Sequence, residues 1–493
     1  MTVSSGAFPH PVYERHVLGP AFRESQRLLF SHMIAASEAH TLMLHETGNL
    51  PEAQAVALLR ALSDVATRGP EAFTYAPAVE DLFFVVEARL IELAGPEAGG
   101  NLQIARSRND LDAVMCRLML RGRLLAIQDD VIALRTVLLA AAAGHVRTLM
   151  PGITHTQPAQ PTTLAHYLLG VLGPLERDSA RLLAAWDRVN QCPLGVAAFT
   201  TTSFPIDRAL TARLLGFDGI VENGYDAVGA NDQMLESVHA LVNMTGSLSR
   251  FVHDLLIWAR KEVGILRIDD AFIQISSIMP QKRNPVVLEH IRARIGYVHG
   301  DAATVQTIVH SAAFGDTVDV EDPIYVPLDR TFDAATAVVE LLIAALETAT
   351  FDTDLLASRA AEGHITTTAL AEGLVREYGL PFRAAHTVLS QSVNRSLAQG
   401  VAITADLLNE IRTEVLGESV GVTAGFVKAA LDPWAFVEAR TIPGGPAPAT
   451  VEAAIARARD RHAADEAAIS ERRHRVMQAT ADRGDQIQVL AGT

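Results

Sequence analysis

Three long stretches of regularly spaced apolar residues constrain the fold more than any other feature of this chain. They cover residues 117–150, 162–191 and 231–263, and in each of them apolar residues recur every three or four positions. Helices of about 30 residues are far longer than the average helix and pack side by side as a bundle. Residues 285–311 and 331–350 predict two further helices, and aromatic residues make up only 5% of the chain. We therefore expect an all-α fold.

The chain divides into three expected domains. Glycine-containing breaks at 48–49, 69–70 and 95–96 separate short helices and predict an N-terminal helical domain over residues 1–107. The long helices and the loops between them form a central bundle domain over residues 108–352. A turn-like FDTD sequence at 351–354 begins a C-terminal helical domain over residues 353–493. In that domain, residues 451–483 are expected to form one exposed helix ahead of a loose tail.

Charge and cysteine content argue against several kinds of partner. The formal net charge of −16 disfavours nucleic acid and an anionic membrane surface, because both require a basic patch. The longest apolar stretch, 124–143, is interrupted by polar and charged residues and is not expected to span a membrane. Two cysteines are too few for a disulfide framework, and nucleotide-binding and HExxH motifs are absent from the sequence, so we expect no cofactor and no metal. The N-terminal segment MTVSSGAFPHPVYERH lacks the apolar core of a signal peptide, which favours a cytoplasmic location.

The run SSIMPQKRNP, residues 276–285, carries the first candidate chemistry. Its two prolines and its polar positions 281–284 exclude a helix interior or a central strand, so we expect an ordered or gated loop. Ser276 or Ser277 could act as a base if its hydroxyl pKa were lowered, and Lys282 supplies a positive charge that would favour the alkoxide. The alternative is a solvated surface loop.

Two further polar segments stand apart from the apolar pattern. ARSRND, residues 105–110, lies at the start of the first long helix, where free backbone N–H groups and Arg108 could bind a carboxylate. A plain helix cap is the alternative. THTQPAQPTT, residues 154–163, contains prolines that exclude a regular helix until after Pro161, and its His155 could transfer protons. A structural histidine is the alternative there.

Taken together, the three segments resemble those of the fumarase/aspartase superfamily, which carries such motifs in this order on a scaffold of long helices. Within the superfamily the chain is most similar to argininosuccinate lyases, through EDLFFVVE at 80–87, PLGVAAF at 193–199 and LVREYGLPFRAAH at 374–386. The resemblance implies a carbon–nitrogen lyase that acts on a dicarboxylate or amino-acid substrate. It also implies a homotetramer with a core of twenty helices, in which each active site takes its three motifs from three different subunits.

The resemblance also assigns roles position by position. Ser276 matches the catalytic base, and Ser277 remains a rival for that role. His155 matches the histidine of the acid–base machinery, and Glu289 matches the acid that pairs with it. Lys282 matches a group that stabilises the carboxylate beside the departing proton. The positions matched to substrate binding are Ser107, Arg108, Asn109, Thr154, Met279 and Asn284.

The region that would bind the amine half of argininosuccinate departs from that family. Where those enzymes have a tyrosine, a glutamine and a lysine in a YNKDLQEDK segment, an ungapped alignment from Gly300 places Asp316, Glu321 and Ile324. The acidic groups of Asp316, Asp319 and Glu321 would favour a cationic amine or diamine. A solvated acidic loop is the alternative.

The sequence therefore predicts reversible β-elimination of an amine from an N-substituted aspartate, with release of fumarate. The reaction would proceed by abstraction of a Cβ proton and through an aci-carboxylate intermediate. An ethylenediamine-disuccinate-lyase-like activity is one example of such a reaction. Argininosuccinate lyase proper and a non-catalytic structural homologue are the alternatives.

Overall fold

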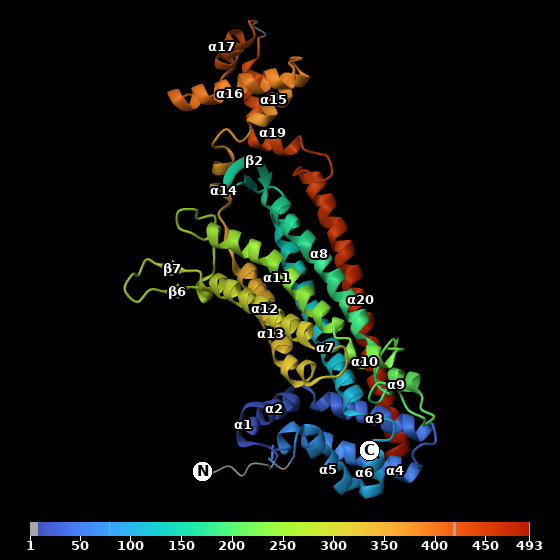
Figure 1. Ribbon diagram of the computed structural model, residues 1–493. Coiled ribbons are helices and arrows are strands. Elements are labelled where there is room, and N and C mark those ends of the chain that lie inside the picture. Colours follow the sequence, from blue (N-terminus) through green and yellow to red (C-terminus); the bar gives the residue numbers. More distant parts are fainter. Residues whose placement is uncertain (1–7, 78, 418–420, 493) are drawn as a thin grey trace.

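A computed structural model describes residues 8–77, 79–417 and 421–492 of the chain. Over these ranges the chain is mostly helical, and its strands form only two-stranded sheets, so the predicted all-α fold is confirmed. Figure 1 shows an elongated molecule in which a bundle of long helices separates N-terminal helices at one end from C-terminal helices at the other. No helix in the described ranges is both long and apolar enough to cross a membrane. Residues 1–7, part of the segment predicted not to be a signal peptide, lie outside the described residues.

The central bundle consists of long helices at or near the predicted places. Its members are α7 (Arg108–Gly144), α8 (Leu164–Val189), α11 (Asp232–Trp258), α12 (Val286–Ser311) and α13 (Asp322–Thr348). Helix α7 begins nine residues before its predicted start, 117, and ends six residues before its predicted end, 150. The start predicted for α13, residue 331, was wrong by nine residues, or about two and a half turns. Proline suits the first helical turn, where Pro323 lies, and Pro327 is accommodated inside the helix, although the sequence pattern marks both as breakers.

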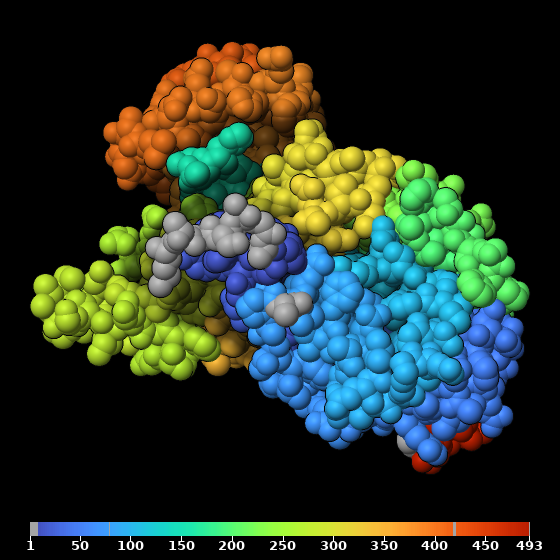
Figure 2. Space-filling model, turned by 60° about the horizontal axis from the view of Figure 1, so that its bottom comes forward, coloured from blue at the N-terminus to red at the C-terminus, as the bar shows by residue number. Residues whose placement is uncertain are grey.

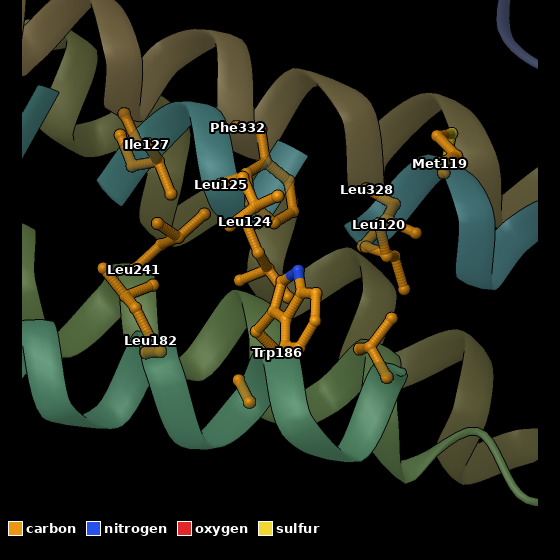
Figure 3. Packing of buried hydrophobic residues seen from close by; sticks show 14 of the residues in the cluster. Met119, Leu120, Leu124, Leu125, Ile127, Leu182, Trp186, Leu241, Leu328 and Phe332 are labelled. Atoms are coloured by element: carbon orange, nitrogen blue, oxygen red, sulfur yellow. The ribbon is translucent and has the colours of Figure 1, made fainter. Parts of the chain in front are cut away.

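The core of the bundle is a continuous apolar layer between these helices. Trp186 of α8 is 1% exposed and is among the largest fully buried side chains. Figure 3 shows it in one apolar cluster with Leu124 of α7 and Phe332 of α13. The apolar residues that recur along the predicted helices therefore face one another, as the three- and four-residue spacing requires.

Shorter helices cover the two ends of the bundle. The N-terminal end has α1 (Pro11–Tyr13), a π-helix (Glu14–Leu18), α2 (Gly19–Leu28), α3 (Phe30–Glu46), α4 (Glu52–Arg68), a 3₁₀ turn (Pro70–Ala72), α5 (Leu82–Ala94) and α6 (Pro96–Asn101). The other end has α14 (Thr353–Ala360), α15 (Thr367–Arg376), α16 (Phe382–Gln399), α17 (Ala405–Leu416), α18 (Ala424–Ala430) and α19 (Pro433–Glu438). The helices α9 (Arg208–Leu214) and α10 (Gly224–Gly229) lie in the connection between α8 and α11.

Short strands shape the loops between helices. The antiparallel pairs are β1 (Leu149–Thr154) with β2 (Gln157–Thr163), β5 (Leu266–Arg267) with β8 (Thr350–Phe351), and β6 (Gln274–Ile275) with β7 (Arg283–Asn284). A parallel pair joins β3 (Gln191–Cys192) to β4 (Gly219–Ile220). Two 3₁₀ turns, Asp270–Phe272 and Val318–Val320, complete the described elements. Two of the predicted motif loops, 154–163 and 276–285, are therefore built on hairpins.

The C-terminal helix α20 (Pro448–Ala491) differs from its prediction. The expected loose tail after residue 483 was wrong, because the helix continues to Ala491. It packs along α7 and α8 and reaches α3, α4 and α9 at the N-terminal end of the bundle. Ion pairs join it to neighbouring elements along this path, and they are Arg461–Glu176, Arg472–Asp187, Arg473–Asp129, Arg475–Asp218 and the more buried Arg483–Glu38.

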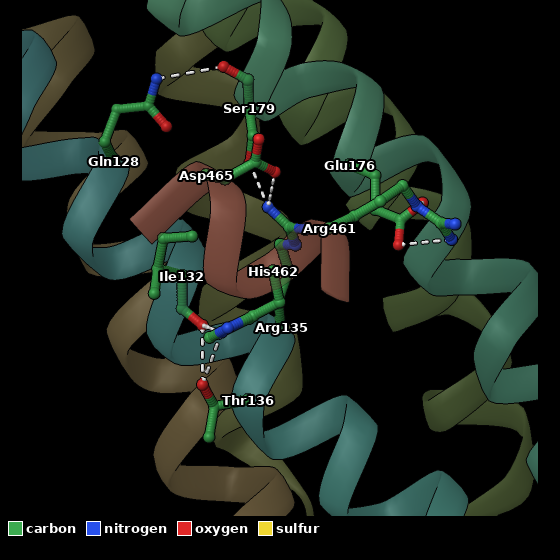
Figure 4. A network of polar contacts seen from close by, with 9 residues as sticks. All are labelled: Gln128, Ile132, Arg135, Thr136, Glu176, Ser179, Arg461, His462 and Asp465. Atoms are coloured by element: carbon green, nitrogen blue, oxygen red, sulfur yellow. Dashed lines mark hydrogen bonds and ion pairs between the residues drawn. The ribbon is translucent and has the colours of Figure 1, made fainter. Parts of the chain in front are cut away.

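A buried polar layer lies where α20 crosses α7 and α8 (Figure 4). Arg135 of α7 has no solvent exposure, and its Nη1 donates to Asp465 Oδ2 of α20 at 2.6 Å and to Ser179 Oγ of α8 at 3.0 Å. Gln128 Nε2 donates to the Ser179 carbonyl oxygen at 3.1 Å. One buried guanidinium therefore depends on a carboxylate that only α20 supplies.

Replacing Asp465 with alanine should lower the free energy of unfolding by about 3 kcal/mol, because a buried cation loses its ion pair. The Nε and Nη2 atoms of Arg135 already have no hydrogen-bond partner among the described residues, so no other group compensates. Asp187→Ala, which removes a more exposed pair with Arg472, should cost less than about 1 kcal/mol. Chemical denaturation of the two variants and the wild type checks this, and equal losses would contradict it.

Candidate active site

The ARSRND segment, residues 105–110, leads into the first turn of α7, as the sequence predicts. Ser107 is the N-cap residue, and the Asp110 carboxylate closes a capping box by accepting the Ser107 N–H at 2.9 Å. The Ser107 hydroxyl donates to Asn109 Oδ1 at 2.7 Å. The three predicted substrate-binding positions 107–109 therefore lie together at a helix N-terminus, where the helix dipole favours an anion.

Arg108 is surrounded by acidic side chains. Its guanidinium forms an ion pair with Asp81, lies 3.9 Å from Glu80 Oε2, and packs over the Phe84 ring at 5.4 Å. Burial acts to lower the pKa of Arg108, but the neighbouring carboxylates outweigh it and raise the pKa. Arg108 is therefore a firmly charged group held in a fixed position.

The acidic loop at 316–321, which was predicted to bind the amine half of the substrate, lies close to Arg108. Asp316 and Glu321 form a carboxyl–carboxyl hydrogen bond, and both interact electrostatically with Arg108. Burial, together with the charge of Asp316, raises the pKa of Glu321 to about 7. Two of the three predicted acidic groups thus share a proton near neutral pH, whereas Asp319 is exposed on the surface. Ile324, the third position aligned with the family's polar residues, is fully buried and faces the core.

More carboxyl groups lie behind the pair, in positions that the sequence did not single out. Asp112 and Asp322 line a cavity of about 30 Å³ together with Arg108 and Glu321, which is room for about one water molecule. Burial and then the charges of Glu321 and Asp322 raise the pKa of Asp112 well above its usual range. The end of the bundle at α7 therefore carries more acidic groups than Arg108 can neutralise.

Thr154 and His155 lie at the opposite end of α7. They belong to the β1–β2 hairpin, in which Thr154 pairs with Gln157 and leaves His155 and Thr156 as the two turn residues. Both turn residues have positive φ values, 51° and 64°, as a type I′ turn requires. The exposed His155 side chain is thus presented at the tip of the hairpin.

The SSIMPQKRNP segment forms a loop closed by the β6–β7 hairpin, and in Figure 2 this yellow-green part of the chain projects from the side of the molecule. Ser276 Oγ accepts the Met279 N–H at 3.1 Å, and the Lys282 N–H donates to the Met279 carbonyl at 3.0 Å. Ser277 and Met279 are exposed. The loop is therefore ordered by its own backbone hydrogen bonds while its side chains remain accessible.

A cationic cavity of about 980 Å³ lies beneath this loop. Lys282, Asn284 and Glu289 line it, so three of the predicted site residues come together here. Its other charged lining residues are Arg260, Lys261, Glu262, Arg267, Arg283 and Arg292. The excess of positive charge suits a carboxylate-bearing ligand.

One chain does not bring all the predicted site residues together. Arg108 is the first residue of α7 and the His155 hairpin follows its last, so the 37 residues of α7 hold them roughly 55 Å apart at about 1.5 Å per residue. Glu289 lines the cationic cavity at the start of α12, on a different element from its predicted partner His155. The three motifs thus form three separate groups on one subunit.

Comparison with known proteins connects this arrangement to a family. A family model described as "Lyase" matches residues 20–300, and one described as "Argininosuccinate lyase C-terminal" matches residues 364–438. Argininosuccinate lyase 1 of Shouchella clausii (strain KSM-K16) is 36% identical over 455 residues, which cover 92% of this chain and 91% of that protein. The chain belongs to the argininosuccinate lyase family of the fumarase/aspartase superfamily. It is accordingly a fumarate-forming carbon–nitrogen lyase.

Two solved structures share the fold of this argininosuccinate lyase family member over nearly its whole length. EDDS lyase in complex with formate has a TM-score of 0.87 at 30% identity and covers 96% of each chain. An EDDS lyase variant with bound fumarate also has a TM-score of 0.87, at 29% identity, and covers 99% of this chain and 97% of that one. The long-helix bundle and its flanking units are therefore those of the superfamily.

The carboxyl pair predicts a pH dependence of stability. Glu321 holds its proton in the folded chain up to about pH 7, against an ordinary pKa of 4.5, so between these values the folded state binds more protons than the unfolded state. Stability contributed by the pair is therefore present below about pH 4.5 and is lost as the pH rises through about 7. Glu321→Gln, which cannot ionise, should become more stable relative to the wild type between pH 5 and pH 8.

Thermal unfolding of both proteins across this pH range measures the effect. Asp319→Asn, at an exposed position of the same loop, is the matched control and should show no such trend. A Glu321→Gln stability difference that stays constant with pH would contradict the shared proton.

Proposed function

We propose that the enzyme forms a homotetramer and releases fumarate from an N-substituted aspartate other than argininosuccinate, or adds the amine to fumarate in reverse. The amine half is a cationic amine or diamine, as in an ethylenediamine-disuccinate-lyase-like reaction. The observation that carries the proposal is the Asp316–Glu321 carboxyl pair beside Arg108. An ammonium group can take the place of the proton that this pair shares.

The base would be a serine of the exposed loop. Ser276 is favoured over Ser277, because its Oγ already accepts a backbone N–H and such bonds stabilise an alkoxide. Lys282 and Asn284, in the cationic cavity, would hold the carboxylate that takes up charge when the Cβ proton leaves. His155, paired with Glu289 of another subunit, would protonate the departing nitrogen.

The opposite end of the substrate would lie on the start of α7. Ser107, Arg108 and Asn109 offer donors and positive charge to a carboxylate, and Thr154 and Met279 would complete the binding surface from other subunits. Because one chain carries these groups at separate places, a complete site requires several subunits. The five long bundle helices of each chain would then form the twenty-helix core of the tetramer.

Argininosuccinate lyase proper is the second candidate. Its support is the name shared by the relatives, including that of Shouchella clausii. Against it stand the acidic groups at positions 316 and 321, which would repel the α-carboxylate of arginine. A non-catalytic structural role has less support, because the candidate serine base, lysine, histidine and glutamate are all present, as Ser276, Lys282, His155 and Glu289.

Loss of fumarate ultraviolet absorbance in the presence of different amines separates the two enzyme candidates. We expect consumption with ethylenediamine or another diamine, and none with arginine. The double variant Asp316→Asn and Glu321→Gln should lower kcat/KM for the diamine by about 10²-fold, since two charge-assisted contacts are lost. Asp319→Asn is the control and should keep its activity. Fumarate consumption with arginine, and with no other amine, would instead support argininosuccinate lyase activity.

A further inference from the structure

Asp110 connects two segments that lie 85 or more residues apart in the chain. It is fully buried in the first turn of α7, directly after Arg108 and Asn109. Its Oδ1 accepts the Ser107 N–H at 2.9 Å, and its Oδ2 accepts the N–H groups of Gly195 and Ala197, each at 2.8 Å. All three donors are backbone groups. One carboxylate therefore ties the turn at 107–109 to the segment at 195–197.

Backbone strain marks the segment that Asp110 holds. Ala197 and Thr201 have φ values of 52° and 61°, in the left-handed region that non-glycine residues rarely adopt. Such residues are strained and persist only where their surroundings fix them. Ala105, at the other segment, has φ 59°. The turn at 195–201 is thus kept in a conformation that it would not adopt alone, and Asp110 supplies two of the bonds that keep it there.

Close packing through α10 connects the 195–201 turn to the acidic loop. A Cβ atom on Gly224 would lie 1.8 Å from the carbonyl oxygen of Phe199, so α10 starts directly against the turn. At the end of α10, a Cβ atom on Gly229 would lie 2.9 Å from the Gly315 nitrogen, next to Asp316. The 107–109 turn, the 195–201 turn, α10 and the acidic loop therefore follow one another around the start of α7.

We propose that Asp110 is a positioning residue for the lyase reaction. It fixes Arg108 and Asn109 against the 195–201 turn, so that the dicarboxylate-binding groups keep one geometry relative to the acidic loop. The inference rests on the proposed function, because it takes Arg108 and Asn109 to bind the dicarboxylate. Asp110 itself does not touch the substrate, since its carboxylate is buried and occupied by backbone donors.

Electrostatics agree with this role at neutral pH. Burial raises the pKa of Asp110 to about 6, against the opposing effect of the three N–H groups and of Arg106. Arg106 is itself buried, and its Nη1 donates to Ser37 Oγ at 3.0 Å. The carboxylate is therefore mostly ionised at pH 7, with a cation fixed nearby.

Asp110→Asn tests the proposal, because it keeps the size of the side chain but turns an NH₂ group toward at least one N–H donor. We expect the Kd and the KM for fumarate to rise at least about tenfold, while kcat changes by less than about threefold. An interaction that is equally strong in the ground state and the transition state changes the binding affinity and leaves kcat nearly unchanged. Calorimetric titration with fumarate and initial rates at varied fumarate measure both quantities.

Asp352→Asn is the matched control, because Asp352 Oδ1 accepts the Leu355 N–H at 2.9 Å at the start of α14. It removes one carboxylate charge at a helix start far from the proposed site and keeps an Oδ1 that can accept the same N–H, so the Kd for fumarate should stay unchanged. Gly195→Ala is a second variant that leaves Asp110 in place and displaces the turn, since its Cβ would lie 2.7 Å from Arg208 Cγ, and it should raise the same Kd.

An Asp110→Asn protein with a lowered melting temperature and an unchanged Kd for fumarate would overturn the inference and leave only a helix cap. An unchanged Kd in Gly195→Ala would also overturn it. A wild-type protein that binds no fumarate would instead overturn the proposed function on which the inference rests. The two failures are therefore distinguishable in the same titration.

Discussion

The rigidity and length of α7 determine what one subunit can do. Arg108 lies at its first turn and His155 on the hairpin beyond its last, and a continuous helix cannot fold back to bring them together. The buried layers around Trp186 and Arg135 hold α7 straight between α8, α13 and α20. A reaction that needs both residues at one substrate therefore requires a second subunit. The proposed homotetramer would meet this requirement.

Charge is distributed unevenly over the chain and fits the two ends of the proposed substrate. The cavity at Lys282 has an excess of cations, whereas the start of α7 places Arg108 among carboxyl groups. The carboxyl pair at positions 316 and 321 holds a proton near neutral pH. The pair can therefore lose that proton when a cationic amine binds beside it. In the proposed assembly, the first region would stabilise the developing aci-carboxylate and the second would select the amine.

Local patterns predicted the long helices and the motif loops, because apolar spacing and proline positions act over a few residues. The contacts that complete the candidate site are long-range and were not predictable in this way. Asp110 reaches a turn 85 residues away, and Asp112 joins Asp322 only through the packing of α7 on α13. The ARSRND segment was expected at a helix start, but nothing in the sequence indicates that Asp110 binds the backbone of Gly195 and Ala197. The alternating charges of α20 suggested an exposed helix followed by a loose tail, whereas the helix continues to Ala491 and forms ion pairs with α3, α7, α8 and the loop before β4.

Mixing two inactive variants tests the shared site most directly. Arg108→Ala disables the first motif, and the double variant Ser276→Ala and Ser277→Ala disables the third. If each site takes these motifs from different subunits, mixing equal amounts of the two variants by denaturation and refolding should restore about a quarter of the wild-type activity. In random hybrids, about half of the sites receive an intact first motif, and about half of these also receive an intact third motif. No recovery from refolded hybrids, under conditions in which the wild type regains activity, would contradict an active site shared between subunits.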